Sequence, residues 1–315
     1  MKIIDGIENM KERLPYPVLT IGNFDGVHLG HQAIFRMLID RAREKNGTSV
    51  VLTFMPHPLR VIAPERSPKL LTLYKDKLNF ITDSGIDVII CINFTKEFAD
   101  ITAENFVTGI LCNVLGIKEV FIGPNYTFGK GRRGSTELLR ELGEQCGFEV
   151  TIVDEIRINH SVVSSSRIRV LVAKGKVDEA AALLGRLYSV EGIVIEGAKR
   201  GKSLLSTPTA NLLTANELLP KDGVYAVMVE MDGERYGGAT NIGFNPTFEE
   251  KKFSFETHVL DFDGNLLGKT LRVHFVKRIR DEMKFSNIDD LSAQMKKDIA
   301  EIRDIVKDYV DSRHG

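Results

Sequence analysis

The sequence contains no tryptophan, only three cysteines in 315 residues, and no apolar run near the ~20 residues that a membrane helix needs. Cys91, Cys112 and Cys146 are odd in number and lack Cys-x-x-Cys spacing, so they give no support to a disulfide framework. We interpret them as small core residues of a protein in a reducing cytoplasm. The first six residues include two charged side chains, Lys2 and Asp5, and lack the apolar segment of a signal peptide, so we expect neither secretion nor a membrane location.

An excess of one charge is also missing, because 42 Lys and Arg residues nearly balance 43 Asp and Glu residues. A net charge of −1 creates no basic field to attract nucleic acid or an anionic membrane. We therefore expect small-molecule partners only, and a monomer or weak homo-oligomer. The length favours about two domains, and a composition of 43% hydrophobic and 27% charged residues is typical of globular proteins.

In the first half, strand-like runs alternate with helical patterns, at residues 18–22, 49–54, 88–94, 119–123 and 148–153. This alternation predicts an α/β domain built on an open parallel sheet with helices on both faces. Ligands bind such sheets beyond the carboxyl ends of the strands. The unusual residues of this half fall at those ends.

The most distinctive stretch, residues 17–44, combines a buried strand, a glycine-rich turn and a helix that we expect at residues 31–44. Two imidazoles, His28 and His31, fall at the turn. The free N–H groups and partial positive charge of a helix N-terminus favour a bound phosphate. Two surface histidines on a tight turn are the plain alternative, which is disfavoured by the residues around them, Gly22, Phe24, Asp25, Gly26 and Gly30.

Three further loops fall at the same predicted edge, at residues 53–58, 123–134 and 164–169. Taken singly, they have plain interpretations as a proline-shaped loop, a solvated basic loop and a serine cap of a helix. The capped helix start also suits a phosphate chain, because Arg167 and Arg169 lie near it. Four such loops at one edge of a sheet predict a binding site.

These motifs resemble the nucleotidyltransferase half of bacterial bifunctional riboflavin kinase/FAD synthetases, whose sheet is Rossmann-like. The similar segments are residues 22–31 (Gly-x-Phe-Asp-Gly-x-His-x-Gly-His), 54–58, 123–134 and 163–169. The resemblance implies transfer of AMP from ATP to FMN, which yields FAD and pyrophosphate. The FMN phosphate is already an anion, so catalysis is mainly positioning and charge neutralisation, for which His28, His31 and Arg167 are the implied catalytic residues.

The resemblance also assigns binding residues. For ATP they are Gly22, Phe24, Asp25, Gly26, His28, His31, Ser165 and Arg167. For the isoalloxazine of the flavin they are Phe54, Pro56, Pro58, Asn125 and Phe128.

The pattern changes near residue 185, where a helix expected at residues 170–184 ends at a glycine. Short strand-like runs then follow closely, at residues 188–196, 223–230, 234–242, 253–260 and 270–276. This spacing predicts an antiparallel β-barrel. Apolar residues three or four apart predict one C-terminal helix at residues 286–313 that docks on the barrel. We therefore predict two domains, residues 1–185 and 186–315.

Two patches of the second half carry candidate chemistry. A Gly/Lys-rich loop at residues 197–202 is suited to phosphates, and Thr209 and Asn211 beyond it offer hard oxygen ligands for Mg²⁺. The second patch contains Glu256, a carboxylate in a strand with apolar neighbours. A solvated loop and a carboxylate on the exposed face of a strand are the plain alternatives.

Both patches resemble the riboflavin kinase module, through Pro-Thr-Ala-Asn at 208–211, Asn-Ile-Gly-x-x-Pro-Thr-Phe at 241–248, Glu-x-His at 256–258 and Arg-x-Glu-x-Lys-Phe at 280–285. The resemblance implies phosphorylation of riboflavin by ATP, with Glu256 as general base on the ribityl 5′-hydroxyl. It implies that Thr209 and Asn211 hold Mg²⁺. The other ATP and flavin contacts are Gly197, Lys202 and Arg280.

We predict a bifunctional enzyme that converts riboflavin to FMN and FMN to FAD, with ATP as co-substrate and Mg²⁺ as the metal. The segment 201–208 departs from the family pattern by an apparent insertion. This departure motivates a competing interpretation, a monofunctional FMN adenylyltransferase whose kinase-like barrel only binds flavin. A non-enzymatic flavin- or RNA-binding protein is disfavoured by the near-zero charge and the complete set of phosphate-site residues.

Overall fold

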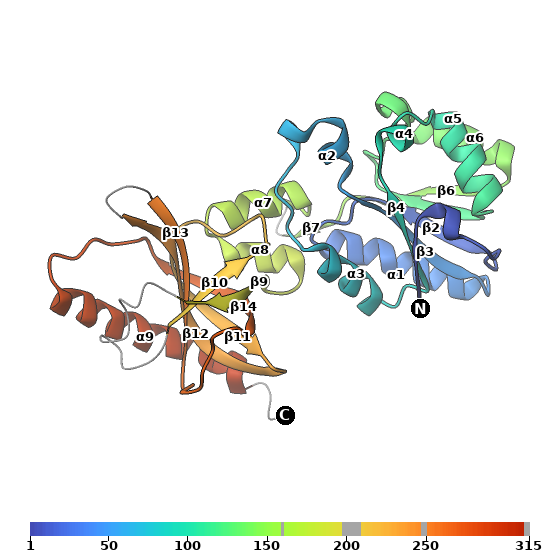
Figure 1. Cartoon of the computed structure of the whole chain (residues 1–315). Helices are drawn as coiled ribbons and strands as arrows, with labels where there is room; N and C mark the ends of the chain where they lie inside the picture. The colour runs from blue at the N-terminus through green and yellow to red at the C-terminus, as the bar shows by residue number, and fades with distance from the viewer. Residues whose placement is uncertain (159–160, 197–208, 247–250, 312–315) are drawn as a thin grey trace. The chain divides into compact units, whose positions relative to one another are not determined.

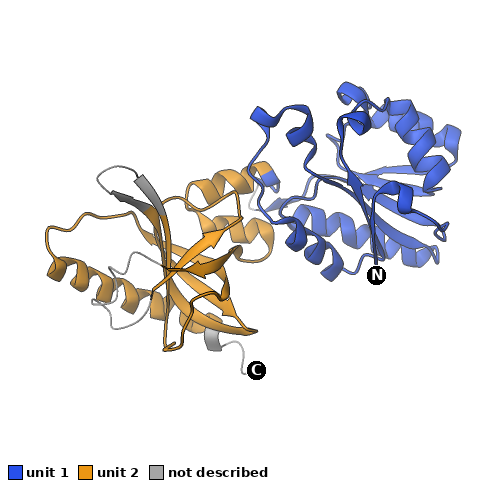
Figure 2. Ribbon diagram, viewed as in Figure 1, with its two compact units in different colours: residues 1–165 blue, residues 166–315 orange. Residues whose placement is uncertain are grey.

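The computed structural model describes residues 1–158, 161–196, 209–246 and 251–311, and for residues 244–246, 251–253 and 310–311 it describes the backbone alone. The chain divides into two compact units, Met1–Ser165 and Ser166–Gly315 (Figure 2). Each unit has one main sheet (Figure 1). The predicted limit of the modules near residue 185 remains a prediction.

The first unit is built on a six-stranded parallel sheet in the order β1-β4-β3-β2-β5-β6. Its strands are β1 (Lys2–Asp5), β2 (Pro17–Ile21), β3 (Thr48–Met55), β4 (Val88–Asn93), β5 (Glu119–Ile122) and β6 (Glu149–Ile152). Five of them lie within a residue or two of the predicted runs. The sixth, β1, was not predicted because it is a short edge strand with three exposed side chains out of four.

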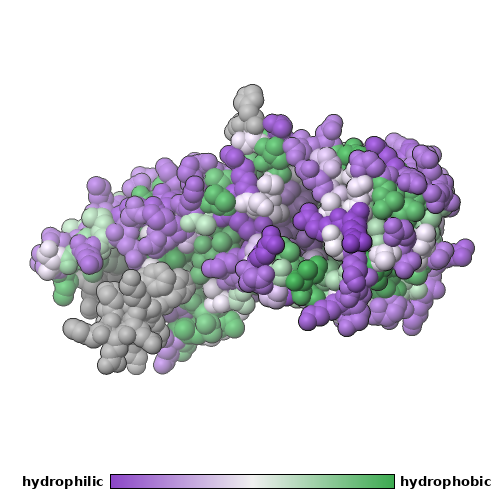
Figure 3. All heavy atoms as spheres, turned by 90° about the horizontal axis from the view of Figure 1, so that it is seen from above, coloured by the Kyte–Doolittle hydropathy of each residue, from purple (hydrophilic) through white to green (hydrophobic). Residues whose placement is uncertain are grey.

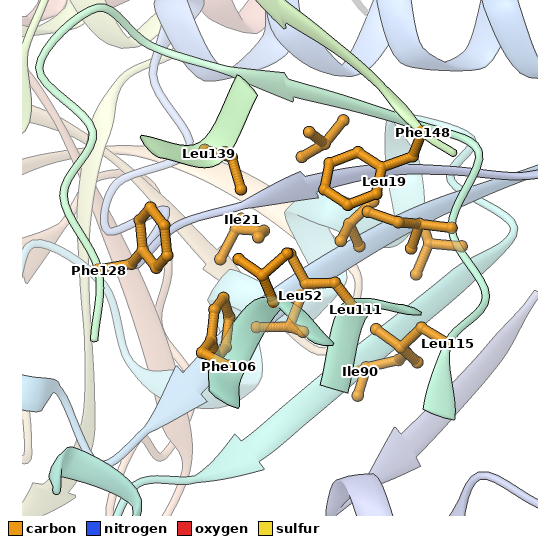
Figure 4. Packing of buried hydrophobic residues seen from close by; sticks show 14 of the residues in the cluster. Leu19, Ile21, Leu52, Ile90, Phe106, Leu111, Leu115, Phe128, Leu139 and Phe148 are labelled. Atoms are coloured by element: carbon orange, nitrogen blue, oxygen red, sulfur yellow. The ribbon is translucent and has the colours of Figure 1, made fainter. Parts of the chain in front are cut away.

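Helices cover both faces of this sheet, as expected for near-continuous apolar strands. On one face α1 (Leu29–Glu44) and α3 (Tyr74–Asp83) bury apolar side chains against the strands. On the other face the π-helix η3 (Phe106–Val114) and α6 (Thr136–Cys146) do the same. Figure 4 shows Phe106 and Phe128 beside Ile21 at one end of this second layer, and Phe148 at the other end.

Short elements complete the first unit. They are η1 (Ile7–Asn9), α2 (Pro58–Ile62), η2 (Pro64–Arg66), α4 (Lys96–Ala99), α5 (Ala103–Asn105), η4 (Lys130–Arg132), β7 (Arg157–Ile158) and β8 (Ser161–Val162).

The second unit contains a closed antiparallel barrel in the order β10-β13-β12-β11-β14-β9, which confirms the predicted barrel. Its strands are β9 (Tyr188–Ile195), β10 (Thr209–Thr214), β11 (Gly223–Met231), β12 (Glu234–Pro246), β13 (Lys251–Val259) and β14 (Thr270–Arg280). Buried aromatic rings of Tyr188, Tyr225, Phe255 and Phe275 contact one another inside the barrel. The helix α9 (Ile288–Asp311) packs its apolar stripe on the outside of β11, β12 and β14.

The single helix predicted at residues 170–184 is wrong. The structure has two helices there, α7 (Ser165–Ala173) and α8 (Val177–Leu184). Gly175 between them has a φ of 75°, and a Cβ atom there would lie 2.6 Å from Cδ of Arg278 on β14. The turn needs a left-handed residue without a side chain, so the helical pattern in the sequence is interrupted.

On the surface drawn in Figure 3, hydrophilic residues dominate and hydrophobic ones form small separate groups. None of the helices in the described residues has the length and apolar character needed to cross a membrane.

Candidate active sites

The first candidate site lies at the carboxyl ends of β2 and β5, two neighbouring strands in the middle of the parallel sheet. From β2 the chain continues to β3 on one side, whereas β5 pairs with β2 on the other side. The helix after β2 covers one face of the sheet and the helix after β5 covers the other. The chain segments that follow β2 and β5 therefore lead to opposite faces of the sheet. Such a topological switch point leaves a crevice at the carboxyl ends of the strands, where ligands usually bind.

At this switch point, the two predicted histidines lie in contact at the start of α1. His28 is the N-cap residue, and its Nδ1 accepts a hydrogen bond from the backbone N–H of His31 at 3.3 Å. The two rings stack with their centroids 3.6 Å apart, and the His31 ring meets Phe24 edge-on. A Cβ on Gly30 would lie 3.1 Å from the His28 ring, so a side chain there would have to displace that ring by a few tenths of an ångström. The predicted helix begins two residues earlier than expected.

The turn before α1 is tightly wound. Phe24, Gly26 and Val27 have φ angles of 49°, 84° and 37°. A left-handed conformation is unusual for a β-branched residue such as Val27, and backbone strain of this kind is concentrated at functional sites. The carbonyl oxygen of Val27 accepts a hydrogen bond from the Gln32 side chain at 2.9 Å, which helps to hold the turn.

Asp25, predicted to bind ATP, is buried and directs its carboxylate into the protein. Its oxygens accept hydrogen bonds from the backbone N–H groups of Leu71 and Thr72 and from the Thr72 hydroxyl, at 3.0 to 3.2 Å. The Asp25 carbonyl oxygen accepts a hydrogen bond from the Ser165 hydroxyl at 2.8 Å. Asp25 therefore joins three segments of the first unit. Arg167 follows two residues after Ser165, in the first turn of α7, and its side chain is exposed.

The predicted flavin residues lie at either end of a row of aromatic side chains. Phe54 at the end of β3 contacts Phe94 and Phe98, and Phe98 contacts Phe106, with ring centroids 5.6 to 6.2 Å apart. Phe106 in turn contacts Phe128, at 5.8 Å. The row links the ends of β3, β4 and β5 at the carboxyl edge of the sheet. Phe94, Phe106 and Phe128 are buried in this row, whereas Phe54 and Phe98 are partly exposed and offer ring surface of the kind that a flat heterocycle stacks against.

The loop after β5 is anchored on both sides of Phe128. Phe128 and Gly134 exchange two backbone hydrogen bonds, at 2.9 and 3.2 Å, and a Cβ on Gly134 would lie 2.7 Å from the Phe128 ring. A Cβ on Gly129 would lie 2.6 Å from the backbone of Ala103. These close approaches fix the Phe128 ring. Asn125 is exposed on the same loop, and its amide donates to Glu155 at 3.4 Å.

Pro56 and Pro58 shape the loop that follows Phe54. The Met55–Pro56 peptide bond is cis, and Pro58 opens α2. His57 between them caps α2 through Nδ1, and its Nε2 lies 3.2 Å from the Asn23 side chain. His57 thus links this loop to the turn before α1. Its role was not predicted, because the sequence does not show that Asn23 is its neighbour.

The second candidate site is a row of polar side chains on the barrel wall. Asn211 on β10 and Asn241 on β12 are the register partners of Glu256 on β13, one on each side. The neighbours Phe255 and Thr257 are buried inside the barrel, so alternation places Glu256 on the outer face, where it is half-buried. Its Oε1 accepts a hydrogen bond from the Ser254 hydroxyl at 2.7 Å. The strand β10, which carries Asn211, was not predicted, because the sequence indicated only a polar patch there.

Thr209 shares this outer face, because it is two residues from Asn211 on the same strand. The hydroxyl and amide oxygens of these residues are suitable ligands for Mg²⁺, which keeps several waters and substrate phosphates around it. Among the described residues, no group of three or more His, Cys, Asp and Glu side chains suits a metal ion. Gly197 and Lys202, the other predicted contacts of this site, and the segment 201–208 lie outside the described residues.

Arg280 makes a contact that the sequence did not indicate. Its guanidinium donates two hydrogen bonds to one carboxylate oxygen of Asp298 on α9, at 2.7 and 2.9 Å. Asp298 is buried, and Gln294 donates to its second oxygen at 2.7 Å. Arg280 also donates a hydrogen bond to the backbone carbonyl oxygen of Asp281 at 3.0 Å. Arg280 therefore ties the end of β14 to the C-terminal helix.

Comparisons with known proteins match both halves of the chain. A family model described as FAD synthetase matches residues 10–167, and one described as riboflavin kinase matches residues 184–306. Residues 168–183 between the two matches, most of α7 and α8, fall in the second compact unit.

Relatives of similar length cover nearly the whole chain. Three bifunctional riboflavin kinase/FMN adenylyltransferases are 37%, 36% and 37% identical, from Buchnera aphidicola (98% of this chain, 99% of the relative), Escherichia coli K12 (95% and 96%) and Bacillus subtilis (92% and 92%). A crystal structure described as a macrolide-efflux protein from Streptococcus pneumoniae has a TM-score of 0.86 and 31% identity, over 96% of this chain and 98% of that one.

These matches confirm the predicted pair of domain types and the predicted pair of activities. With both family models in order and relatives matched end to end, the chain belongs to the family of bifunctional riboflavin kinase/FMN adenylyltransferases.

Proposed function

We propose that this chain makes FAD from riboflavin in two steps, each with its own site. The barrel transfers the terminal phosphoryl group of ATP to riboflavin, which yields FMN and ADP. The first unit transfers AMP from a second ATP to FMN, which yields FAD and pyrophosphate. The observation that carries this proposal is the end-to-end similarity to bifunctional relatives.

For adenylyl transfer, we assign the triphosphate of ATP to the N-terminus of α1. Its free N–H groups carry a partial positive charge, and in this assignment the rings of His28 and His31 add hydrogen-bond donors for phosphate. The hydroxyl of Ser165 and the guanidinium of Arg167 supply further donors. These groups stabilise the charge that passes to pyrophosphate when the FMN phosphate attacks the α-phosphorus. In this assignment Asp25 contributes by holding the loop, with Gly22, Phe24 and Gly26 shaping it.

The isoalloxazine ring of FMN is assigned to the loops after β3 and β5. Phe54, Pro56 and Pro58 flank it on one side, and Asn125 and Phe128 on the other. The aromatic row that connects Phe54 with Phe128 supports this assignment, because it is continuous between the two loops.

For phosphoryl transfer, Glu256 acts as the general base on the 5′-hydroxyl of riboflavin. Thr209 and Asn211 hold Mg²⁺, which neutralises charge on the phosphates when it is bound. The support for these roles is that Asn211 lies directly beside Glu256 across two paired strands. Arg280 orders the flavin side of the site through its ion pair with the C-terminal helix.

We also propose a cytoplasmic location and a monomeric or weakly associated state. The three cysteines are free thiols, which suits a reducing compartment. On the one face drawn in Figure 3 the hydrophobic groups are small and separate, which fits a weak tendency of that face to associate. The limits of the two modules, residues 1–185 and 186–315, belong to the same proposal.

The competing function is a monofunctional FMN adenylyltransferase with a barrel that only binds flavin. Replacing Glu256 with Gln separates the two, because it removes the base and keeps the shape. Riboflavin phosphorylation is expected to fall by about 100-fold or more, the usual contribution of a general base. FAD formation from supplied FMN should stay the same. Glu234→Gln, an exposed change on the same barrel, is the control.

A wild-type protein that makes no FMN from riboflavin, while it still converts FMN to FAD, would establish the binding-only barrel. Equal FMN formation by the wild type and by Glu256→Gln would exclude Glu256 as the base.

A further inference from the structure

A buried lysine lies beneath the first site and has no place in the mechanism above. Lys77 on α3 is 7% exposed, and its ammonium group donates three hydrogen bonds. The acceptors are the hydroxyl of Thr53 at 3.0 Å and the carbonyl oxygens of Phe54 at 3.2 Å and Asn23 at 3.4 Å. An ammonium group has three donors, so each of its N–H bonds has an acceptor.

These acceptors lie where the two loops assigned to the two substrates begin, since Asn23 follows β2 and Thr53 and Phe54 are near the end of β3. Asn23 begins the turn that leads to the histidines, and Phe54 begins the flavin loop. The Thr53 hydroxyl also lies 3.3 Å from the Asn23 carbonyl oxygen, to which it donates. One ammonium group therefore fixes the separation between the start of the triphosphate loop and the start of the flavin loop.

We propose that Lys77 is a positioning residue for adenylyl transfer, which sets the distance between the FMN phosphate and the α-phosphorus of ATP. The inference rests on the proposed reaction of the first unit and goes beyond it, because Lys77 reaches both loops from a helix outside the motifs. Reacting atoms must approach within about 3–3.5 Å in line, and a displacement of about 1 Å costs roughly 100-fold in rate.

The surroundings of Lys77 make its charge sensitive to pH. Burial lowers the pKa of Lys77 to about 8, while nearby Cys91 on β4 and Asp25 on the turn act in the opposite direction. The ring of Tyr74 lies 5.4 Å from Nζ on the same helix. Below pH about 8 the ammonium group makes all three bonds. Above it the neutral amine has only two N–H donors for these three acceptors, so at least one of the three bonds is lost, the connection between the two loops weakens and adenylyl transfer should slow.

The test compares Lys77→Met and Lys77→Arg with the wild type and with Lys75→Met, an exposed lysine change on the same helix. Rates of FAD formation from FMN and ATP are measured from pH 6 to about 9.5, with riboflavin phosphorylation by the same preparations as an internal reference. We expect Lys77→Met to lower kcat for FAD formation by about 30-fold or more, with KM changed much less. Lys75→Met and all kinase rates should stay within about twofold of the wild type.

The pH profile separates positioning by charge from a general packing role. The wild type should lose FAD-forming activity as the pH rises through about 8, and its kinase activity should not follow. Arginine stays charged at these pH values, so Lys77→Arg should retain some activity and lack this fall.

Near-normal kcat in Lys77→Met, or the same alkaline fall in Lys77→Arg, would overturn the inference. If Lys77→Met does not fold, the wild-type and Lys77→Arg profiles still decide it. Absence of FAD formation by the wild type would instead overturn the proposed function of the first unit.

Discussion

Replacing Asp25 with Asn should destabilise the first unit and slow FAD formation, because Asp25 holds a loop. In the wild type, the buried carboxylate accepts from two backbone N–H groups and one hydroxyl of Leu71 and Thr72. The amide oxygen can take the place of Oδ1, which accepts from all three donors, but the charge is lost and the NH₂ group then faces the backbone N–H of Leu71. Hydrogen bonds to a charged group contribute about 1 kcal/mol more than neutral ones, so three of them amount to about 3 kcal/mol.

A destabilisation of about 3 kcal/mol should lower the melting temperature measurably. In a unit of this size about 1 kcal/mol corresponds to roughly 2–4 °C, so the unfolding transition of the first unit should fall by about 6–12 °C. Differential scanning calorimetry measures this shift, and FAD formation is assayed on the same samples. Asp83→Asn, an exposed change on α3, should shift the transition by less than about 2 °C.

The reasoning would be refuted if Asp25→Asn kept the wild-type melting temperature and lost ATP affinity. That result would show that Asp25 contacts ATP directly, as the sequence motif implies, instead of acting through the loop.

Three further outcomes follow from the site geometry. Gly30→Ala should lower the rate of FAD formation by about tenfold, because its Cβ would lie 3.1 Å from the His28 ring. Its stability should change little, because alanine favours the helix by about 1 kcal/mol and offsets the close contact. Steady-state kinetics and thermal unfolding measure the two effects. Asp298→Ala should destabilise the barrel unit by about 3 kcal/mol and raise KM for riboflavin, because it leaves Arg280 without its buried carboxylate. Denaturant unfolding measures the stability and kinase assays measure KM, and an unchanged stability would contradict the prediction. Chelation of Mg²⁺ should stop riboflavin phosphorylation and FAD formation, and added Mg²⁺ should restore both; FMN formation at an unchanged rate in chelator would contradict the metal assignment.

Most elements of the fold were predictable because their signals are local. Apolar runs and the alternation of periods located five of the six strands of the parallel sheet, the barrel and the C-terminal helix. The strand β1 was not predicted because a four-residue edge strand with three exposed side chains gives no clear pattern. The break between α7 and α8 escaped because it depends on the close approach of Gly175 to Arg278, more than a hundred residues away.

The candidate sites divide in the same way. The motifs are recognisable in the sequence, and the structure brings His28 and His31 together and places Asn211 beside Glu256, while their roles remain predictions. The connections between motifs were not found. Lys77 lies 54 residues from Asn23 and Arg280 lies 18 from Asp298, and a sequence carries no sign of such long-range pairs.

The measurement that tests the central claim most directly is a chromatographic time course with purified protein, riboflavin, ATP and Mg²⁺. Two working sites predict that FMN appears first and FAD follows at its expense, with ADP and pyrophosphate as the other products. Riboflavin that stays unchanged while supplied FMN becomes FAD would contradict the claim that the chain carries out both reactions.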